Sequence, residues 1–576
     1  MLESVAFSSV MYSISESDAV AEELSLLEQA ARTNTMDRTI TIHSIMLISF
    51  FITNTSTIYN SVLIIYFQKT KGKVQYQRRI SCITAEKSAD SHGGTKRDVS
   101  KAMEQENRKN RIELSPALIT DLFVYVMLAG LPLWFDKGGY TNLTTSKFIF
   151  FAVTTGIWAM LTAVSAIRRE EKIRMTSDKW IVILFVIFAG LSALFSPFQE
   201  HVWMGSGRYN GYVTLLMYAL LFLGVSSYGT MKSSYPVVFI CSLAVCSVVA
   251  VLQLLGQNPF HLYPGDWNYY DKGIYYSSEF LGNVGNVDLF GALLCAGIPM
   301  AAAQALLGKK KSSVLLMIPT GLCLFVGLVM DVAALKLGLL GAFVVLFILC
   351  FRHRQSLQKG KTVLVIAILI ISVVSISTLT FREGSVSFRW RQDEAAETAA
   401  ESEPGDWDMI KNGDWEKAGS SRLGIWKKLL ETVPEYPWLG SGPGTVADRA
   451  DMVFERYVPE TGNTLKARVD NAHNEYLEFL VCEGLIGLCL YLLLIMITIR
   501  RCRKEKDLRK IILIPALTGY WIQSFFGLGL ILVLPVVYIF WALCASERKK
   551  ENENVDSPVS NGERSRYAAR RLSKST

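Results

Sequence analysis

The chain has 576 residues, of which 51% are hydrophobic and only 19% are charged, a balance too apolar for a soluble protein of ordinary composition. The net charge is +8, but the basic residues cluster beside apolar runs rather than forming a basic face interleaved with aromatic residues, which argues against a nucleic-acid partner. The ten cysteines include no CxxC pair and no Cys/His cluster of zinc-ligand spacing, so we expect neither a metal site nor a disulfide scaffold.

Residues 1–113 form a poorly defined N-terminal extension that is rich in Ser and Thr. An apolar run at 40–67 has a polar centre between Asn54 and Asn60, so a membrane helix there is one alternative and a segment that does not span is the other. No basic region followed by an apolar core opens the chain, and we expect insertion through internal spans without a cleavable signal peptide. A false upstream start, with the protein beginning at Met103, is also open.

Residues 114–546 contain repeated apolar runs of about 20 residues, the length that crosses a bilayer as a helix with every backbone amide satisfied. These runs predict an all-α polytopic membrane bundle of about twelve transmembrane helices. The predicted spans are 115–135, 148–167, 180–198, 212–228, 236–255, 289–307, 314–330, 337–351, 362–380, 476–499, 511–528 and 530–546.

Short loops rich in lysine and arginine stay on the cytoplasmic side of a membrane, and alternate loops of this chain are basic. Both ends of the 114–546 core are then cytoplasmic. The polar, basic tail at 547–576 is expected to be cytoplasmic and disordered. The opposite, extracytoplasmic side receives the loops at 136–147, 199–211, 256–288 and 381–475.

The loop at 381–475 is longer than a simple connection requires, which is typical of a functional segment. Apolar residues recur at helical spacing over 421–433 and stop at a proline, so we expect short amphipathic helices on the membrane surface. Thr445 and Asp448 are spaced like a capping box for a second short helix that continues through Arg456.

This loop ends in Asp470-Asn471-Ala472-His473-Asn474-Glu475-Tyr476, directly before an apolar run. We therefore expect His473 in the first turn of a membrane helix, where unpaired amides and a partial positive charge favour a neutral imidazole. A neutral imidazole can act as a base, and Asp470 can orient the ring or raise its pKa, which leaves the direction of the net shift open. The alternative is an interfacial histidine with a capping role.

Two upstream segments carry further candidates for ligand binding. Arg208 lies among glycines in Gly205-Ser206-Gly207-Arg208-Tyr209-Asn210-Gly211, and arginine suits phosphate because its planar fork offers two parallel donors and stays charged. The sixth span is preceded by the segment Leu281-Gly282-Asn283-Val284-Gly285-Asn286-Val287-Asp288. Its small and amide residues allow the backbone to approach a ligand closely. The alternatives are a snorkelling anchor for the first segment and an ordinary turn with a helix cap for the second.

Together these segments resemble the O-antigen ligase and polysaccharide polymerase family of bacterial membrane glycosyltransferases. The resemblance covers roughly 115–546 and lies mainly in a C-terminal signature, with Arg208-Tyr209-Asn210-Gly211 and Gly282-Asn283 also similar to the family. The signature reads Ser421-Arg422-Leu423-Gly424-Ile425-Trp426, then Pro437-Trp438-Leu439-Gly440-Ser441-Gly442-Pro443-Gly444, then Asn471-Ala472-His473-Asn474-Glu475-Tyr476-Leu477-Glu478, then Glu483-Gly484-Leu485-Ile486-Gly487-Leu488.

The resemblance implies transfer of a glycan, without metal or cofactor, from an undecaprenyl-diphosphate-linked donor to an acceptor hydroxyl on a glycan or cell-wall polymer. The resemblance also implies that the reaction takes place at the outer face of the bacterial cytoplasmic membrane, as in an O-antigen ligase or a polysaccharide polymerase. A diphosphate leaving group needs fixed positive charge, and an acceptor hydroxyl needs a base near its proton. The catalytic candidates are His473 and Arg422. The substrate-binding candidates are Arg208, Asn210, Asn474, Asp470, Asn283 and Lys336.

The candidate Lys336 lies where this chain differs from the family. Many members carry a Ser-Arg pair after the seventh span, and this chain has Ala333-Ala334-Leu335-Lys336 there. Two rival functions are a transporter or flippase of lipid-linked glycans and an inactive glycan-binding membrane protein. Transporters place ionisable residues or broken helices near the bilayer midplane. The predicted spans are nearly free of charge, which favours chemistry at the membrane surface.

Overall fold

The computed structural model describes residues 115–255, 257–263, 282–330, 332–357, 359–363, 365–366, 379–382, 385–388, 411–412, 422–450, 452–458 and 463–547. Three expectations lie outside these residues. They concern the extension at 1–113 with its apolar run, nearly all of the tail at 547–576, and most of the span at 362–380.

Within the described part of the chain, eight helical segments are long and apolar enough to cross a membrane, and two shorter apolar helices accompany them. This confirms the predicted polytopic helical bundle, while the count of twelve stays a prediction. The eight are α5 (Pro116–Leu133), α6 (Leu143–Arg168), α7 (Ser177–Phe195), α9 (Tyr235–Leu254), α11 (Val287–Leu307), η2 with α12 (Lys311–Leu316 and Met317–Val329), α13 (Ala333–Arg352) and α19 (Gly484–Lys504). The shorter pair is α8 (Tyr212–Tyr228) and α22 (Leu534–Ala545).

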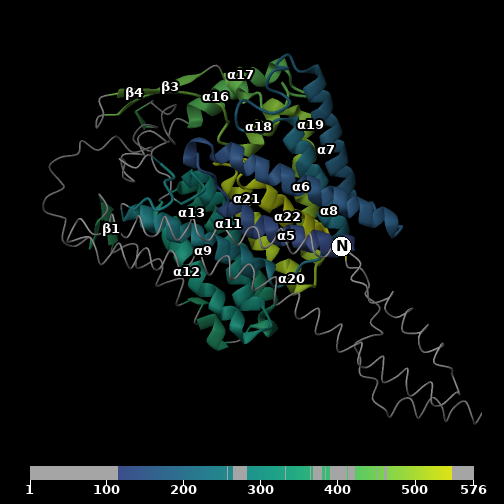
Figure 1. Cartoon of the computed structure of the whole chain (residues 1–576), viewed down its shortest axis with the longest axis vertical. Coiled ribbons are helices and arrows are strands. Elements are labelled where there is room, and N and C mark those ends of the chain that lie inside the picture. The colour runs from purple at the N-terminus through teal and green to yellow at the C-terminus, as the bar shows by residue number, and fades with distance from the viewer. Residues whose placement is uncertain are drawn as a thin grey trace, which may run out of the picture. The chain divides into compact units, whose positions relative to one another are not determined.

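Helix α11 lies at the centre of the bundle (Figure 1). Every residue from Asp288 to Leu307 is buried, because α11 is apolar on all sides and contacts α9, α12, α13 and α21 (Leu513–Gln523). Small residues allow this close packing, and a Cβ on Gly297 would lie only 2.4 Å from Leu243 Cδ1. The burial of α11 fixes the position of its first turn.

Helix α6 shows the opposite pattern, with one apolar face directed away from the bundle. Large apolar side chains are exposed along it at intervals of three or four residues, which is the spacing of one helix face. They are Ile149, Val153, Ile157, Met160, Leu161, Val164 and Ile167. The hydrocarbon of a bilayer would cover this face.

The predicted span at 476–499 consists of two helices. Helix α18 (Glu475–Cys482) ends before Glu483, and α19 begins at Gly484. Gly484 has a φ of +70°, in the left-handed region that favours glycine. A Cβ there would lie 2.3 Å from the carbonyl oxygen of Trp438, so the break depends on this glycine.

The predicted span at 511–528 also ends early. It contains the last residue of α20 (Leu508–Ile511) and the whole of α21, which stops at Gln523. Residues 524–533 are not helical. Most of this segment is nevertheless buried, including Leu528 and Leu530. Non-helical backbone at such a depth leaves carbonyl groups for other partners, and the carbonyl oxygen of Phe526 accepts a hydrogen bond from Arg422.

The end of the bundle at the top of Figure 1 carries α16 (Arg422–Thr432), α17 (Val446–Ala450) and α18. Helix α16 with η6 (Val433–Glu435) confirms the helix predicted over 421–433. Other described elements are η1 (Gly139–Thr141), η3 (Arg354–Ser356) and the antiparallel pair β1 (Leu379–Arg382) and β2 (Ser385–Phe388).

The expected continuation of the second short helix through Arg456 is wrong. Helix α17 stops at Ala450, and Arg456 lies in an antiparallel hairpin of β3 (Val453–Val458) and β4 (Asn463–Arg468). The β3 sequence is rich in β-branched and aromatic residues, which favour a strand. Asp448 does not cap the helix through its side chain but accepts a hydrogen bond from His201 Nδ1 at 2.9 Å.

Candidate active site

The candidate base lies just before the helix that follows it. Helix α18 begins at Glu475, and Asn474 is its N-cap, whose side-chain oxygen accepts hydrogen bonds from two backbone N–H groups of the first turn at 3.0 and 3.1 Å. The expectation that His473 lies inside the first turn is therefore wrong, because asparagine is a strong N-cap residue and the helix begins after it. His473 itself has a φ of +48°, and its backbone N–H donates to Asn471 Oδ1 at 2.8 Å.

The glycine-rich turn of the signature packs against the break between α18 and α19. Gly440 has a φ of +73°, and a Cβ there would lie 2.3 Å from the carbonyl of Cys482. The backbone N–H of Ser441 donates to Val481 O at 3.0 Å, and that of Gly442 donates to Cys482 O at 2.9 Å. The turn therefore satisfies carbonyl groups that the end of α18 leaves unpaired, which explains why these pieces of the signature occur together.

Arg422, at the start of α16, connects that helix to the centre of the bundle. Its Nη2 donates to Asp288 Oδ2 at 2.9 Å, and its Nη1 donates to the carbonyl oxygen of Phe526 at 2.8 Å. Asp288 is in the first turn of α11, and Phe526 belongs to the non-helical segment after α21. Asp288 lies in the motif at 281–288, but its local sequence predicted no role for it.

Arg208 forms a second ion pair of the same kind. Its Nε donates to Asp470 Oδ2 at 2.5 Å, which joins the glycine-rich segment before α8 to the segment before α18. The side chain of Arg208 is 37% exposed. A guanidinium group has five N–H donors, so this contact leaves most of them for a ligand.

The charged side chains of both ion pairs act on the pKa of His473. Burial, followed by the guanidinium groups of Arg422 and Arg208, lowers the pKa of His473 to about 4, although Asp288 and Asp470 act in the opposite direction. Its Nδ1 is buried and has no hydrogen-bond partner among the described residues. The imidazole is therefore neutral near pH 7, and the direction of its pKa shift, which the sequence left open, is downward.

Asn210 and Asn471 meet at one carboxylate that the sequence analysis did not single out. Glu478 Oε1 accepts a hydrogen bond from Asn210 Nδ2 at 3.1 Å, and its Oε2 accepts one from Asn471 Nδ2 at 2.6 Å. Asn210 was predicted to bind substrate, but its amide nitrogen is engaged with the protein. Glu478 stands in the quoted signature, and only the folded arrangement of three segments shows what it contacts.

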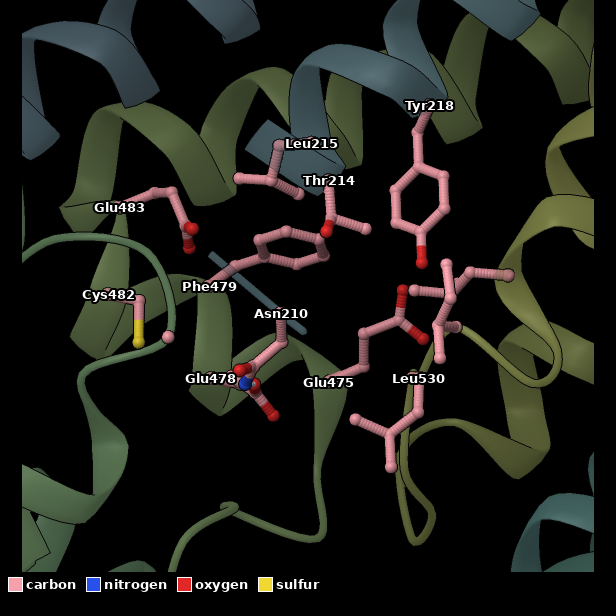
Figure 2. Close-up of a pocket in the computed structure, with 14 residues that line it drawn as sticks. Asn210, Thr214, Leu215, Tyr218, Glu475, Glu478, Phe479, Cys482, Glu483 and Leu530 are labelled. Carbon is pink, nitrogen blue, oxygen red and sulfur yellow. Dashed lines mark hydrogen bonds between the residues drawn. The ribbon is translucent and has the colours of Figure 1, made fainter. Parts of the chain in front are cut away.

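A small cavity lies beside these residues (Figure 2). It has a volume of about 40 Å³ and is lined by Glu475, Glu478 and Glu483 together with Asn210 and Tyr218, among others. Figure 2 shows Asn210 next to Glu478, and Glu475 below the hydroxyl group of Tyr218. Since a buried water needs roughly 10–15 Å³, the cavity has room for about three waters. It is too small for a sugar.

The structure does not bring Asn283 or Lys336 into this cluster. The buried Asn283 donates from Nδ2 to the carbonyl oxygens of Pro132 and Leu133 at 3.1 and 2.9 Å, and so caps the end of α5. Lys336 is exposed in the first turn of α13. Neither contributes to the charges that act on His473, and their predicted substrate contacts stay predictions.

The fold and this cluster define a multi-pass helical membrane protein with arginine, aspartate and histidine side chains gathered at one end of its bundle. Residues 316–492 match the family model described as O-Antigen ligase. This match confirms the resemblance to the O-antigen ligase family, and it contains Arg422, Asp470, His473 and Glu478.

One curated relative matches part of the same chain. A general O-oligosaccharyltransferase of Acinetobacter baylyi (strain ATCC 33305 / BD413 / ADP1) is 26% identical over 133 residues. The aligned part is 22% of this chain and 20% of that protein, so the chain matches about a fifth of the relative's length.

Proposed function

We propose that the protein transfers a glycan from an undecaprenyl-diphosphate-linked donor to an acceptor hydroxyl at the outer face of the bacterial cytoplasmic membrane, without a metal ion. The acceptor is a glycan or a cell-wall polymer. The observation that carries this proposal is one neutral histidine within the electrostatic reach of two arginines, Arg422 and Arg208, at one end of a membrane bundle. The family match and the oligosaccharyltransferase relative support the same reaction class.

The chemistry assigns one task to each side chain. The acceptor oxygen forms a bond to the anomeric carbon, and the bond from that carbon to the diphosphate oxygen breaks. The imidazole of His473, which is neutral near pH 7, takes the proton of the acceptor hydroxyl. Arg422 and Arg208 stabilise the charge that develops on the departing lipid diphosphate.

The aspartates keep the two arginines in position before the donor binds. Asp288 and Asp470 each accept a charge-assisted hydrogen bond from an arginine, so the cluster carries no net charge while His473 is neutral. Each guanidinium group retains N–H donors beyond those bonds. A diphosphate can therefore bind without breaking either ion pair.

Substitutions in cells test the assignment. We expect His473→Ala to lower surface polysaccharide synthesis by roughly 100-fold or more, since general base catalysis contributes about 10²–10⁴-fold. Arg422→Ala is expected to lower it by about 10²–10³-fold. His201→Ala is the matched control, because His201 is paired with Asp448 outside the cluster. Normal polysaccharide synthesis in His473→Ala and Arg422→Ala cells, with the variants at normal levels in the membrane, would refute the catalytic assignment.

A further inference from the structure

The backbone of the proposed base is held by a short chain of hydrogen bonds that begins at a carboxylate in α18. Glu478 Oε2 accepts from Asn471 Nδ2 at 2.6 Å, and Asn471 Oδ1 accepts from the backbone N–H of His473 at 2.8 Å. The amide of Asn471 is thus used at both ends, which fixes its orientation. This orientation in turn supports the left-handed backbone of His473, whose φ is +48°.

The same carboxylate also holds the segment that carries Arg208. Its other oxygen, Oε1, accepts from Asn210 Nδ2 at 3.1 Å. Asn210 follows Arg208 by two positions, and Asn471 lies next to Asp470, the partner of Arg208. Glu478 takes part in none of the ion pairs among the described residues. There it accepts hydrogen bonds from the side-chain amides of Asn210 and Asn471.

We infer that Glu478 is a positioning residue that aligns the His473 and Arg208 segments through Asn471 and Asn210. This inference rests on the proposed function, because alignment matters only if His473 acts on a substrate. Both oxygens of Glu478 accept hydrogen bonds and both asparagines donate them, so the donor and acceptor roles in this arrangement are fixed. A misplacement of about 1 Å in a catalytic group can lower a rate on the order of 100-fold, which is the loss expected when the chain of bonds breaks.

In the hydrogen bond between Asn471 and Glu478, Asn471 donates and Glu478 accepts. A pair of substitutions can therefore exchange the donor and the acceptor between the two positions. In Asn471→Asp, the new carboxylate still accepts from the backbone of His473 but faces Glu478 with a second acceptor. The two repel when Glu478, whose pKa burial raises to about 7, is ionised. The double variant Asn471→Asp/Glu478→Gln restores a donor opposite the acceptor, since the Gln amide donates to the new carboxylate while its oxygen still accepts from Asn210. The net charge of the pair equals that of the wild type.

The first readout is release of undecaprenyl diphosphate by purified protein at pH 7.5, with a lipid-linked oligosaccharide as donor. We expect Asn471→Asp to lower kcat about 100-fold with little change in donor KM, and the double variant to recover at least a tenth of the wild-type kcat. The control pair is Asn471→Asp/Glu483→Gln. It replaces a carboxyl group that lines the same cavity, but Oε2 of Glu483 has no partner among the described residues, so it should not recover activity.

The second readout does not depend on activity. Diethyl pyrocarbonate modifies exposed histidines, and mass spectrometry locates the modified sites. His473 should react several-fold faster in Asn471→Asp and return to the wild-type rate in the double variant, with His201 as the internal reference. Wild-type reactivity in Asn471→Asp, or a double variant as impaired as the single one, overturns the inference. An inactive wild type refutes the proposed function, and the modification rates then still decide whether Glu478 positions His473.

Discussion

His473 is a titratable side chain in surroundings that oppose its positive charge. Its pKa is lowered from 6.5 to about 4, first by burial and then by Arg422 and Arg208. The base form is the neutral one, so activity that needs it is present above the pKa and is lost as the pH falls through it. The acid limb of kcat/KM should therefore lie near pH 4 to 5.

Arg422→Gln tests the cause of this shift. Removal of the guanidinium charge removes one of the influences that lower the pKa of His473, so the acid limb should move toward higher pH. The measurement is kcat/KM for donor release between pH 4 and 8, and residual activity suffices because only the shape of the profile matters. An acid limb near 6.5 in the wild type, or one that stays in place in the variant, contradicts this electrostatic account.

At this scale the sequence named side chains that the structure brings together, but not their partners. His473, Arg422, Arg208 and Asp470 were all named from their local patterns, and the structure brings them together. Asp288 was given no role because it is 134 positions from Arg422 along the chain. A pairing over that distance depends on how α11 and α16 are placed, which no local pattern records.

The break between α18 and α19 is the element on which the site is built. Gly484→Ala should destabilise it, because the residue has a φ of +70° and a Cβ would lie 2.3 Å from the carbonyl of Trp438. The left-handed conformation alone costs about 1–2 kcal/mol for a residue other than glycine, and the close contact adds to it. We expect a lower unfolding temperature for the detergent-solubilised variant.

Gly156→Ala is the matched control for that substitution. Gly156 lies within α6, and a Cβ there would meet no atom within 4 Å. Alanine has the higher helix propensity, so the unfolding temperature of this variant should stay the same or rise. Equal effects of the two substitutions would mean that the backbone of Gly484 is not strained by a side chain.

Asn474 offers a separate test of the same element. As the N-cap of α18 its side-chain oxygen accepts two backbone hydrogen bonds, and loss of such a cap costs about 1 kcal/mol. Asn474→Ala should therefore lower the unfolding temperature, whereas Asn474→Ser, which can still cap, should largely retain it. If the serine variant is as unstable as the alanine variant, capping is not the role of Asn474.

At the scale of the whole molecule, apolar run length was enough to predict a multi-pass helical bundle. It did not predict where long runs would break, because both breaks depend on close contacts with distant segments. Position 484 requires a glycine because the carbonyl of Trp438 lies beside it. The end of α21 at Gln523 precedes a buried segment that supplies a carbonyl acceptor to Arg422. The hairpin of β3 and β4 was likewise not predicted, because it lies in a loop whose predicted pattern was helical.

The orientation of the bundle is a further prediction for the whole molecule. The basic loops predict that α16 and the cluster face the outside of the cell. A single cysteine at Trp438, which is 64% exposed, should react with a membrane-impermeant maleimide in intact cells. A cysteine at the exposed Lys309 should react only after permeabilisation, with the unsubstituted protein as background. The reverse labelling pattern would place the cluster in the cytoplasm.

The most direct test of transfer chemistry is undecaprenyl diphosphate release by purified protein in detergent. A lipid-linked oligosaccharide and an acceptor are supplied, and wild type is compared with His473→Ala and His201→Ala. We predict release by the wild type and by His201→Ala, and a loss of roughly 100-fold or more in His473→Ala. Because detergent offers no second compartment, release cannot come from transport. Absence of release with donor and acceptor present, or equal release by the His473→Ala variant, would contradict the proposed transferase.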